Sequence, residues 1–309
     1  MITKPTVLVL GAGASMHLEY PSGKGLKEEI LNEALVKTGR HYSKLKESLP
    51  SSMDPAIIPE IINGFHDLLA KSGRQSIDDF LTNNPQYKLA GTVAIAVVIS
   101  AHEDREKLIA NKEGDWYQFL YNVMDSPGTS LQAFSENQLA IITFNYDRSL
   151  EEYLLQTLES NHLEGAGGIT VIDAIKSIPI IHVHGQIGEL GWLSSQGSGR
   201  PYGEKDLLGT AASGIKVIDD VKDNSFAPAW KEIEKSQRII FLGFGYNETN
   251  IKHLLQNFHE QRERLLCGTC FGMTCQEKDD VKVKFKPNTI ELGNPSHKIL
   301  EFLRIEVSL

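Results

Sequence analysis

Four short polar or glycine-rich motifs, each after an apolar run, contain the residues best suited to chemistry. They are GAGAS at residues 11–15, FNYD at 144–147, HVHG at 182–185 and GFGYN at 243–247. Glycines that let backbone N–H groups approach a ligand suit phosphate binding, and a neutral histidine can accept a proton near pH 7. Each motif alone is weak evidence, but four of them at one edge of a sheet would form a site.

The GAGAS motif favours binding of a pyrophosphate beside the N-terminus of the helix expected after it. Its members are Gly11, Ala12, Gly13, Ala14 and Ser15. It is not a full G-x-G-x-x-G pattern, because Met16 stands where the third glycine belongs. No second strand ends in an acid about 20 residues on, since Glu33 falls in a predicted helix, so an ordinary NAD-dependent dehydrogenase is disfavoured. A tight turn without a ligand is the alternative, for GAGAS and for GFGYN.

Side chains of the FNYD and HVHG motifs are suited to bind or activate a sugar hydroxyl or a water molecule. Asn145 could hold a ribose hydroxyl, orient a water molecule or cap a turn. Asp147 could contact a ribose or cap the helix predicted after it. His184 is the best candidate for a base, with a packed core histidine as the alternative. His182 lies two residues earlier on the predicted strand and points to the same face.

The spacing of Cys267, Cys270 and Cys275 suggests a zinc site. A closed zinc site takes four ligands, and His259 and His297 are both distant in sequence. We therefore expect buried or free thiols and no metal.

Positioning the four motifs together requires a sheet. Apolar runs predict strands at residues 7–10, 139–144, 178–183 and 238–242, and a weaker one at 282–285. Helical periodicity is typical of residues 26–35, 58–69, 88–101, 116–124, 249–266 and 296–303, with a capping box at Ser76 and Asp79 opening one more helix. Strands separated by helices predict an α/β, Rossmann-like fold, in which a mostly parallel sheet has helices on both faces.

We expect one domain over residues 1–309 with two insertions. Residues 40–137 are too long for a simple crossover and predict a large helical insertion. Residues 186–230 are rich in glycine and serine and predict a loop or lid.

Composition excludes several classes of protein. The chain has 31 Lys and Arg against 40 Asp and Glu, a net charge of −9, and no basic run, so direct nucleic-acid binding is disfavoured. Three cysteines make no disulfide framework, which favours the cytoplasm. The longest apolar run, residues 90–101, is shorter than the roughly 20 residues that span a bilayer. The apolar start of the chain leads into a glycine turn and is interpreted as a strand, not a signal peptide.

In this order, the motifs GAGAS, TFNYD, HVHG and GFGYNETN resemble the sirtuin superfamily, specifically the divergent sirtuin-like domains of bacterial anti-phage defence systems. The resemblance implies that NAD is bound, and that Asn145 and His184 are catalytic. The implied NAD-binding residues are Gly11, Ala12, Gly13, Ala14, Ser15, Thr143, Asp147, Gly243, Gly245 and Asn247.

Two departures from the sirtuin deacetylases disfavour acyl-lysine substrates. Residues 185–242 contain no cysteine, so the four-cysteine zinc module is missing, and Tyr20-Pro21-Ser22-Gly23 replaces the expected Pro-Asp-Phe-Arg. The resemblance then favours hydrolysis of NAD to nicotinamide and ADP-ribose. The alternatives are ADP-ribosyl or deacyl transfer on a protein, a non-catalytic sensor of NAD or ADP-ribose, and a scaffold subunit.

A cell must restrain NAD hydrolysis until it is triggered. We therefore expect a homo-oligomer or a partner polypeptide. The family context implies a partner such as a HerA-type ATPase or an Argonaute-like protein.

Overall fold

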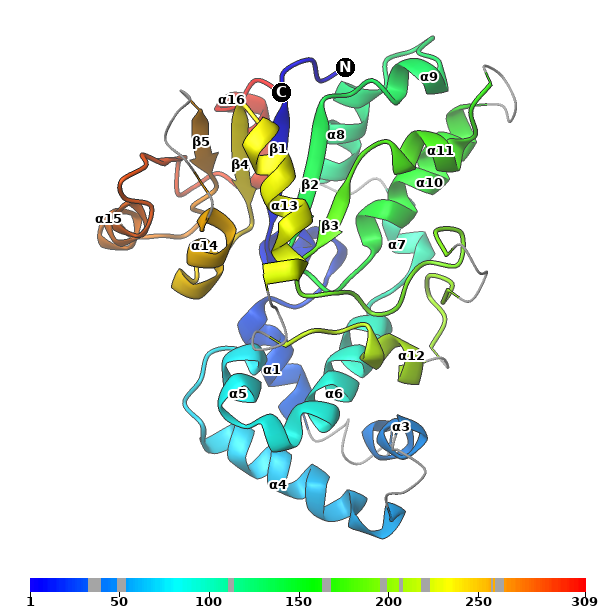
Figure 1. The fold of residues 1–309 in the computed structure, drawn as a ribbon, viewed down its shortest axis with the longest axis vertical. Helices are drawn as coiled ribbons and strands as arrows, with labels where there is room; N and C mark the ends of the chain where they lie inside the picture. Colours follow the sequence, from blue (N-terminus) through cyan, green and yellow to red (C-terminus); the bar gives the residue numbers. More distant parts are fainter. Residues whose placement is uncertain are drawn as a thin grey trace.

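A six-stranded parallel sheet, in the order β3-β2-β1-β4-β5-β6, forms the centre of the computed structural model (Figure 1). The structure describes residues 1–32, 40–48, 54–110, 114–162, 168–194, 199–205, 208–217, 223–256, 258 and 264–309. The strands are β1 (Thr6–Leu10), β2 (Leu139–Thr143), β3 (Ile180–His182), β4 (Arg238–Leu242), β5 (Leu265–Gly268) and β6 (Glu291–Leu292). This is the strand order of a doubly wound Rossmann-like α/β fold, as the sequence predicts.

The register of the central strands brings the motifs together. Leu10 at the end of β1 pairs with Thr143 of β2 on one side and with Leu242 of β4 on the other. The loops that begin at residues 11, 144 and 243 therefore start side by side at the carboxyl edge of the sheet. Strands β1, β2 and β4 are buried along their whole length, which is why they read as continuous apolar runs.

Helices cover both faces of the sheet, and alternate residues of β1 face them. Val7 and Val9 belong to the core cluster with α13 (Asp223–Lys235), α14 (Glu248–Leu255) and α15 (Cys275–Lys284). Leu8 and Leu10 belong to the cluster of the opposite face. Its helices are α8 (Trp116–Met124), α10 (Ser149–Asn161), α11 (Val171–Lys176) and α16 (Ile299–Ile305). Two layers of helices thus exclude water from the sheet.

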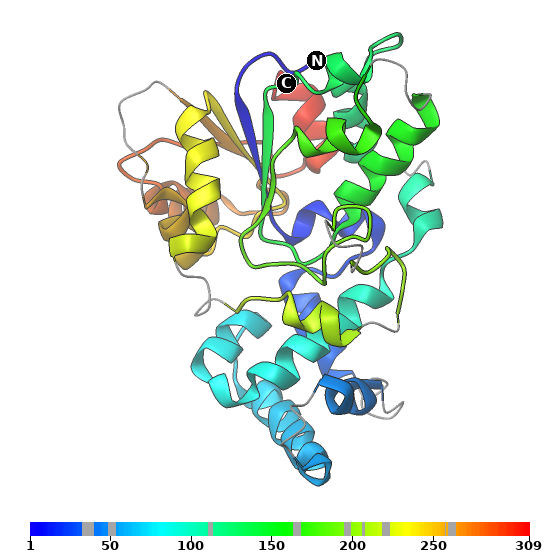
Figure 2. The same cartoon turned by 45° about the vertical axis from the view of Figure 1, so that its right-hand side comes forward.

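A block of helices lies beyond the carboxyl edge of the sheet, on the side away from both termini (Figure 1 and Figure 2). Its members are α1 (Gly23–Leu31), α3 (Arg40–Ser48), α4 (Ile58–Lys71), α5 (Ile77–Asn83), α6 (Lys88–Ala101) and α12 (Leu208–Ser213). Helix α6 is buried from Ala90 to Ser100 because α1, α3, α4, α5 and α12 all pack on it. Along the chain, α7 (Arg105–Ile109), α8 and α9 (Leu131–Phe134) lie between α6 of this block and β2. The division into insertions at residues 40–137 and 186–230 stays a prediction.

Two predicted elements near the C-terminus are wrong. The helix expected over residues 249–266 ends at Leu255, and residues 265–268 form β5 instead. The strand expected at 282–285 belongs to α15, which a capping box between Thr274 and Glu277 opens. Val281 and Phe285 are both buried and four residues apart, which is the spacing of a helix face. The predicted helical position Glu33 and the histidine His259 lie outside the described residues.

Within the described ranges, no helix is both long and apolar enough to cross a membrane.

The turns after β1 and β4 touch through their backbones, which requires glycine. Gly243 has a φ of +58°, and a Cβ there would lie 2.2 Å from the nitrogen of Ala14. A Cβ on Gly11 or Gly13 would lie within 2.8 Å of the Gly243 backbone. These glycines therefore have a packing role in joining the two turns, whether or not a ligand is bound.

Gly243→Ala is expected to destabilise the fold by about 2 kcal/mol or more, because both the positive φ and the close approach oppose a side chain. Gly245→Ala is the matched control, since a Cβ there meets nothing within 4 Å. Urea denaturation of both variants measures the difference. Equal free energies of unfolding for the two variants would contradict this account of the contact.

Candidate functional site

A pocket of about 160 Å³ lies at the carboxyl edge of the sheet, between the strand-end loops and helices α1, α5 and α6. The predicted site residues that line it are Gly11, Ala12, Ser15, Asn145, Asp147, Gly245 and Asn247. Those that do not line it are Gly13, Ala14, Thr143, His184 and Gly243. The structure thus brings residues of GAGAS, FNYD and GFGYN into one cavity.

The sequence predicts a helix after the GAGAS loop, but the loop does not lead into it directly. Two 3₁₀ turns, Ala12–Ala14 and Met16–Leu18, follow β1, and α1 begins only at Gly23. Ser22, the N-cap residue of α1, accepts a hydrogen bond from the N–H of Gly25. Both Ser22 and Gly23 line the pocket, so the start of this helix still faces the same cavity.

Asn145 is held rigidly and offers an unused acceptor. Its Nδ2 donates to the carbonyl of Gly11 at 3.0 Å and to Ser15 Oγ at 3.1 Å, while its backbone N–H donates to Thr143 Oγ1 at 3.0 Å. The Gly11 carbonyl can only accept, so it fixes which way the amide is turned. Asn145 Oδ1 is buried and has no hydrogen-bond partner in the described part of the chain. A buried acceptor without a partner costs about 1–3 kcal/mol, which a ligand or water molecule would recover.

Asp147 ties two motifs together. Its Oδ2 accepts a hydrogen bond from Ser15 Oγ at 2.7 Å. Its Oδ1 accepts from the backbone N–H of Ser149 at 3.2 Å and from the hydroxyl of Ser149, which also bonds to Tyr117. Asp147 therefore holds the start of α10 and also presents its carboxylate beside the GAGAS loop. The two roles that the sequence suggests for Asp147, contact with a ribose and capping of the next helix, are therefore compatible.

His184 is buried just behind the pocket wall. Burial lowers the pKa of its imidazole, although the negative charge of Asp78 opposes the shift, so the ring is neutral near pH 7. Its Nδ1 has no partner among the residues that the structure describes, and the ring of Phe144 lies 5.4 Å away between centroids. The Asn250 side chain also opposes the shift of this pKa, and both Asn250 and Asp78 line the pocket.

The last motif contributes a cap and an open position. Asn247 Oδ1 accepts from the N–H groups of Thr249 at 2.9 Å and Asn250 at 3.3 Å, which opens α14. Gly245 lines the pocket with open space on its side-chain face. Sequence reasoning missed Tyr20, Asp78 and Asn250. Asp78 carried one signal, its place in the first turn of a predicted helix, but an acid there is ordinarily explained by the helix dipole.

Residues 139–270 match the family model of the SIR2-like domain. The matched segment runs from β2 through β5 and includes FNYD, HVHG and GFGYN. SIR2-like domains use NAD, so the match supports the sirtuin-like superfamily and an NAD-related activity. A search of curated proteins finds no match to this chain. The GAGAS loop and all helices of the helical block except α12 precede the SIR2-like segment in the sequence.

His182, which lies in the SIR2-like segment, holds Asn145 by its backbone carbonyl. Its Nδ1 lies 3.1 Å from the Asn145 carbonyl oxygen, and its Nε2 lies 2.6 Å from Glu151 Oε1. Both partners are acceptors, so the ring must donate from both nitrogens and be charged. Burial opposes this charge, but the Glu151 carboxylate and the Asn145 carbonyl outweigh it and raise the pKa of His182.

The stabilising contribution of His182 is expected to depend on pH. Its pKa is higher in the folded protein than in the unfolded chain, so the contribution is complete below about pH 6.5 and is lost as pH rises through the folded pKa. Free energies of unfolding of the wild type and of His182→Asn, measured against pH, should therefore converge on the alkaline side. A difference that stays constant across this range would contradict the charged pair.

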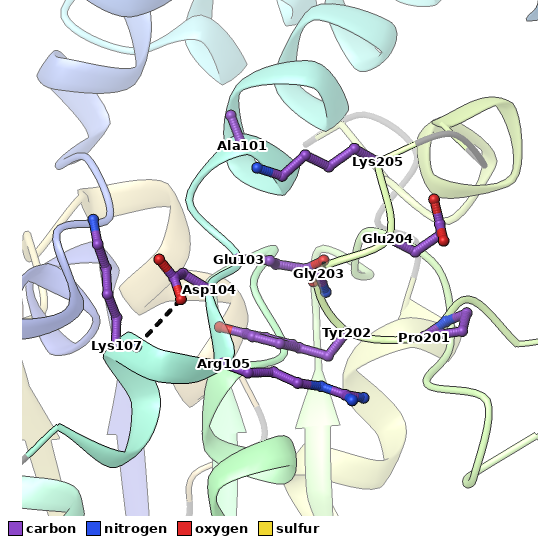
Figure 3. A pocket seen from close by; sticks show the side chains of 10 residues that line it. All are labelled: Ala101, Glu103, Asp104, Arg105, Lys107, Pro201, Tyr202, Gly203, Glu204 and Lys205. Atoms are coloured by element: carbon purple, nitrogen blue, oxygen red, sulfur yellow. Dashed lines mark hydrogen bonds between the residues drawn. The ribbon is translucent and has the colours of Figure 1, made fainter.

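A second, larger cleft of about 550 Å³ lies between α7 and residues 201–205 (Figure 3). Charges of both signs surround it, with Arg105, Lys107 and Lys205 facing Asp104 and Glu204. The hydroxyl of Tyr202 in this cleft lies 2.9 Å from that of Tyr20, which lines the strand-end pocket. The two cavities therefore share a wall, but of the two only the smaller one is lined by residues of GAGAS, FNYD and GFGYN.

None of the three cysteines lines either of the two cavities. Cys267 and Cys270 are buried and Cys275 is exposed. Burial raises the pKa of the Cys267 thiol to about 12. In the described ranges no group of three or more histidine, cysteine or acidic side chains is placed to hold a metal ion.

Proposed function

We propose that this protein hydrolyses NAD⁺ to nicotinamide and ADP-ribose in the strand-end pocket. The observation that carries the proposal is Asn145, whose buried Oδ1 lacks a partner within the described structure while its Nδ2 is fixed against the GAGAS loop. A neutral, buried His184 lies behind the same wall. The match of residues 139–270 to a SIR2-like domain supports NAD as the substrate.

The reaction breaks the bond between nicotinamide and C1′ of the ribose through an oxocarbenium-like transition state. Nicotinamide is a good leaving group, so the protein needs mainly to position the sugar and deliver water. In this proposal Asn145 orients the water or a ribose hydroxyl, His184 is the base, and Asp147 fixes the ribose. Thr143 holds the Asn145 backbone and acts only through it.

The cavity is smaller than the dinucleotide. Ligand sites usually measure about 300–1,000 Å³, whereas this pocket holds about 160 Å³. We infer that binding of NAD widens it by a shift of α1, α5 and α6, which form the wall opposite the strand ends. A pocket that must open offers a way to restrain the enzyme.

We propose further that the enzyme is an effector of anti-phage defence that depletes NAD in the cytoplasm. The resemblance of its motifs to sirtuin-like defence domains supports this role. Assembly into a homo-oligomer, or binding of a partner such as a HerA-type ATPase or an Argonaute-like protein, would open the pocket.

Nicotinamide release from NAD by the purified protein, over a range of protein concentrations, tests the proposal. We expect release of nicotinamide and ADP-ribose in equal amounts, with a steep dependence on concentration if assembly is the trigger. Binding of NAD by calorimetry without turnover, even after addition of candidate partners, would favour a sensor. ADP-ribose recovered on a protein instead of in solution would favour a transferase.

A further inference from the structure

Helix α5 of the helical block places a carboxylate in the strand-end pocket. Ser76 Oγ accepts a hydrogen bond from the N–H of Asp79 at 3.1 Å and so starts α5, which puts Asp78 in its first turn. Asp78 lines the pocket, and the hydroxyl of Tyr146 donates to its Oδ1. Tyr146 belongs to the FNYD loop, so the carboxylate is held between α5 and the end of β2.

Asp78 and His184 interact electrostatically. Burial raises the pKa of the Asp78 carboxyl and lowers the pKa of the His184 imidazole, so burial alone favours the neutral form of each. The charge of each favours the charged form of the other, and each therefore responds to a proton on its neighbour. The other charged or titratable groups that act on the pair are Tyr146 and Asp79 at Asp78, and His253 at His184.

Access from the pocket distinguishes the two groups. Asp78 and Asn250 line the cavity, whereas His184 does not. A water molecule in the pocket therefore meets the carboxylate of Asp78 before it can reach His184.

We propose that Asp78 is a catalytic residue that takes the proton from the attacking water, which leaves His184 as the base toward a ribose hydroxyl. The inference rests on the proposed hydrolysis of NAD. The water oxygen forms a bond to C1′ as the bond from C1′ to the nicotinamide nitrogen breaks, and that electron pair leaves with neutral nicotinamide. The proton of the water passes to the Asp78 carboxylate and from there to solvent.

The first test compares Asp78→Asn with Asp79→Asn in the full-length protein. Each variant removes one negative charge from the first turn of α5, so their effects on the helix dipole match. Asp78→Asn is expected to slow nicotinamide release by about 10²-fold or more, the usual share of a general base, while Asp79→Asn stays near the wild-type rate. An Asp78→Asn enzyme that keeps the wild-type rate would overturn the proposal.

A second measurement separates a catalytic role of Asp78 from a purely structural one. Azide is an anionic nucleophile with no proton to lose, so it needs no general base. Azide added to Asp78→Ala should restore nicotinamide release and yield an azido derivative of ADP-ribose. If Asp78→Ala retains bound NAD but shows no rescue by azide, Asp78 acts only in structure and the proposal fails.

A third measurement does not depend on turnover. The Asp78 carboxylate favours protonation of His184, so in Asp78→Asn the imidazole should titrate at lower pH than in the wild type. NMR titration of the histidine side chains in the free protein measures this, with Asp79→Asn as control and His184→Ala to assign the signal. An unchanged titration of His184 in Asp78→Asn would contradict the electrostatic interaction between Asp78 and His184. If the wild type releases no nicotinamide, the proposed function fails, while this titration still decides whether the Asp78 carboxylate acts on the charge of His184.

Discussion

His184→Ala and Asn145→Ala are each expected to abolish nicotinamide release from NAD while the protein stays folded. Loss of a general base costs about 10²–10⁴ in rate, and His184 is the base toward a ribose hydroxyl in the proposed reaction. Asn145 holds its Oδ1 toward a ligand by two fixed donations from Nδ2, so alanine removes the group that orients the sugar or water. Nicotinamide release, measured under the conditions at which the wild type is active, gives the loss for each variant.

Stability should change little in these two variants. Each intramolecular hydrogen bond contributes about 1 kcal/mol net, and Asn145→Ala also removes a buried acceptor that lacks a partner in the described structure. His297→Ala is the control for loss of an imidazole, because His297, just before α16, pairs with Glu306, just after it, near the C-terminus. Turnover at the wild-type rate in either His184→Ala or Asn145→Ala would remove that residue from the proposed mechanism.

The sequence predicts the strands that are buried on both sides. Strands β1, β2 and β4 are continuous apolar runs that end in glycine or polar residues, and each lies within one or two residues of its prediction. Because parallel strands end at one edge, the same pattern also predicts that the motifs after them meet. Helices α6 and α8 begin and end as predicted.

Elements set by tertiary contacts could not be predicted in the same way. Strand β5 is only four residues long and follows a helical pattern, so its pairing with β4 and β6 decides its conformation. The place of Asp78 in the pocket depends on how the helical block packs under the sheet, which no local pattern of residues encodes. The roles of Gly11 and Gly243 depend on the contact between two turns that are far apart in the chain.

Glu103 is expected to be the residue whose neutralisation destabilises the fold most. It follows α6 and lies between two fully buried guanidinium groups. Its Oε1 accepts from Arg148 at 2.6 Å, and its Oε2 accepts from Arg200 at 2.6 Å. Arg148 in turn donates to the carbonyl of Gly188 at 3.2 Å, and Arg200 donates to the carbonyl of Ile187 at 3.2 Å. The cluster therefore ties the loop that contains these two carbonyls to the start of α10 and to the end of α6.

Glu103→Gln would leave two buried cations without a counter-ion. Removal of one partner from a buried ion pair costs about 3–5 kcal/mol, far more than the pair contributes against an apolar replacement. Burial already lowers the pKa of Arg200, and the Glu103 carboxylate opposes that shift. Urea denaturation should therefore show a large fall in the free energy of unfolding. Glu28→Gln is the matched control, because its ion pair with Lys24 is exposed and surface pairs contribute about 0–1 kcal/mol.

Coupling between the members of the cluster provides the decisive test. If uncompensated charge causes the loss, Arg200→Met in the Glu103→Gln background should cost less than Arg200→Met alone, because it removes one of the two unpaired cations. Lost packing or lost hydrogen bonds would instead make the two changes additive. A Glu103→Gln variant as stable as Glu28→Gln would mean that water or a rearranged loop compensates the arginines. In that case residues 187–194 and 199–204 would not depend on this ion cluster for their position.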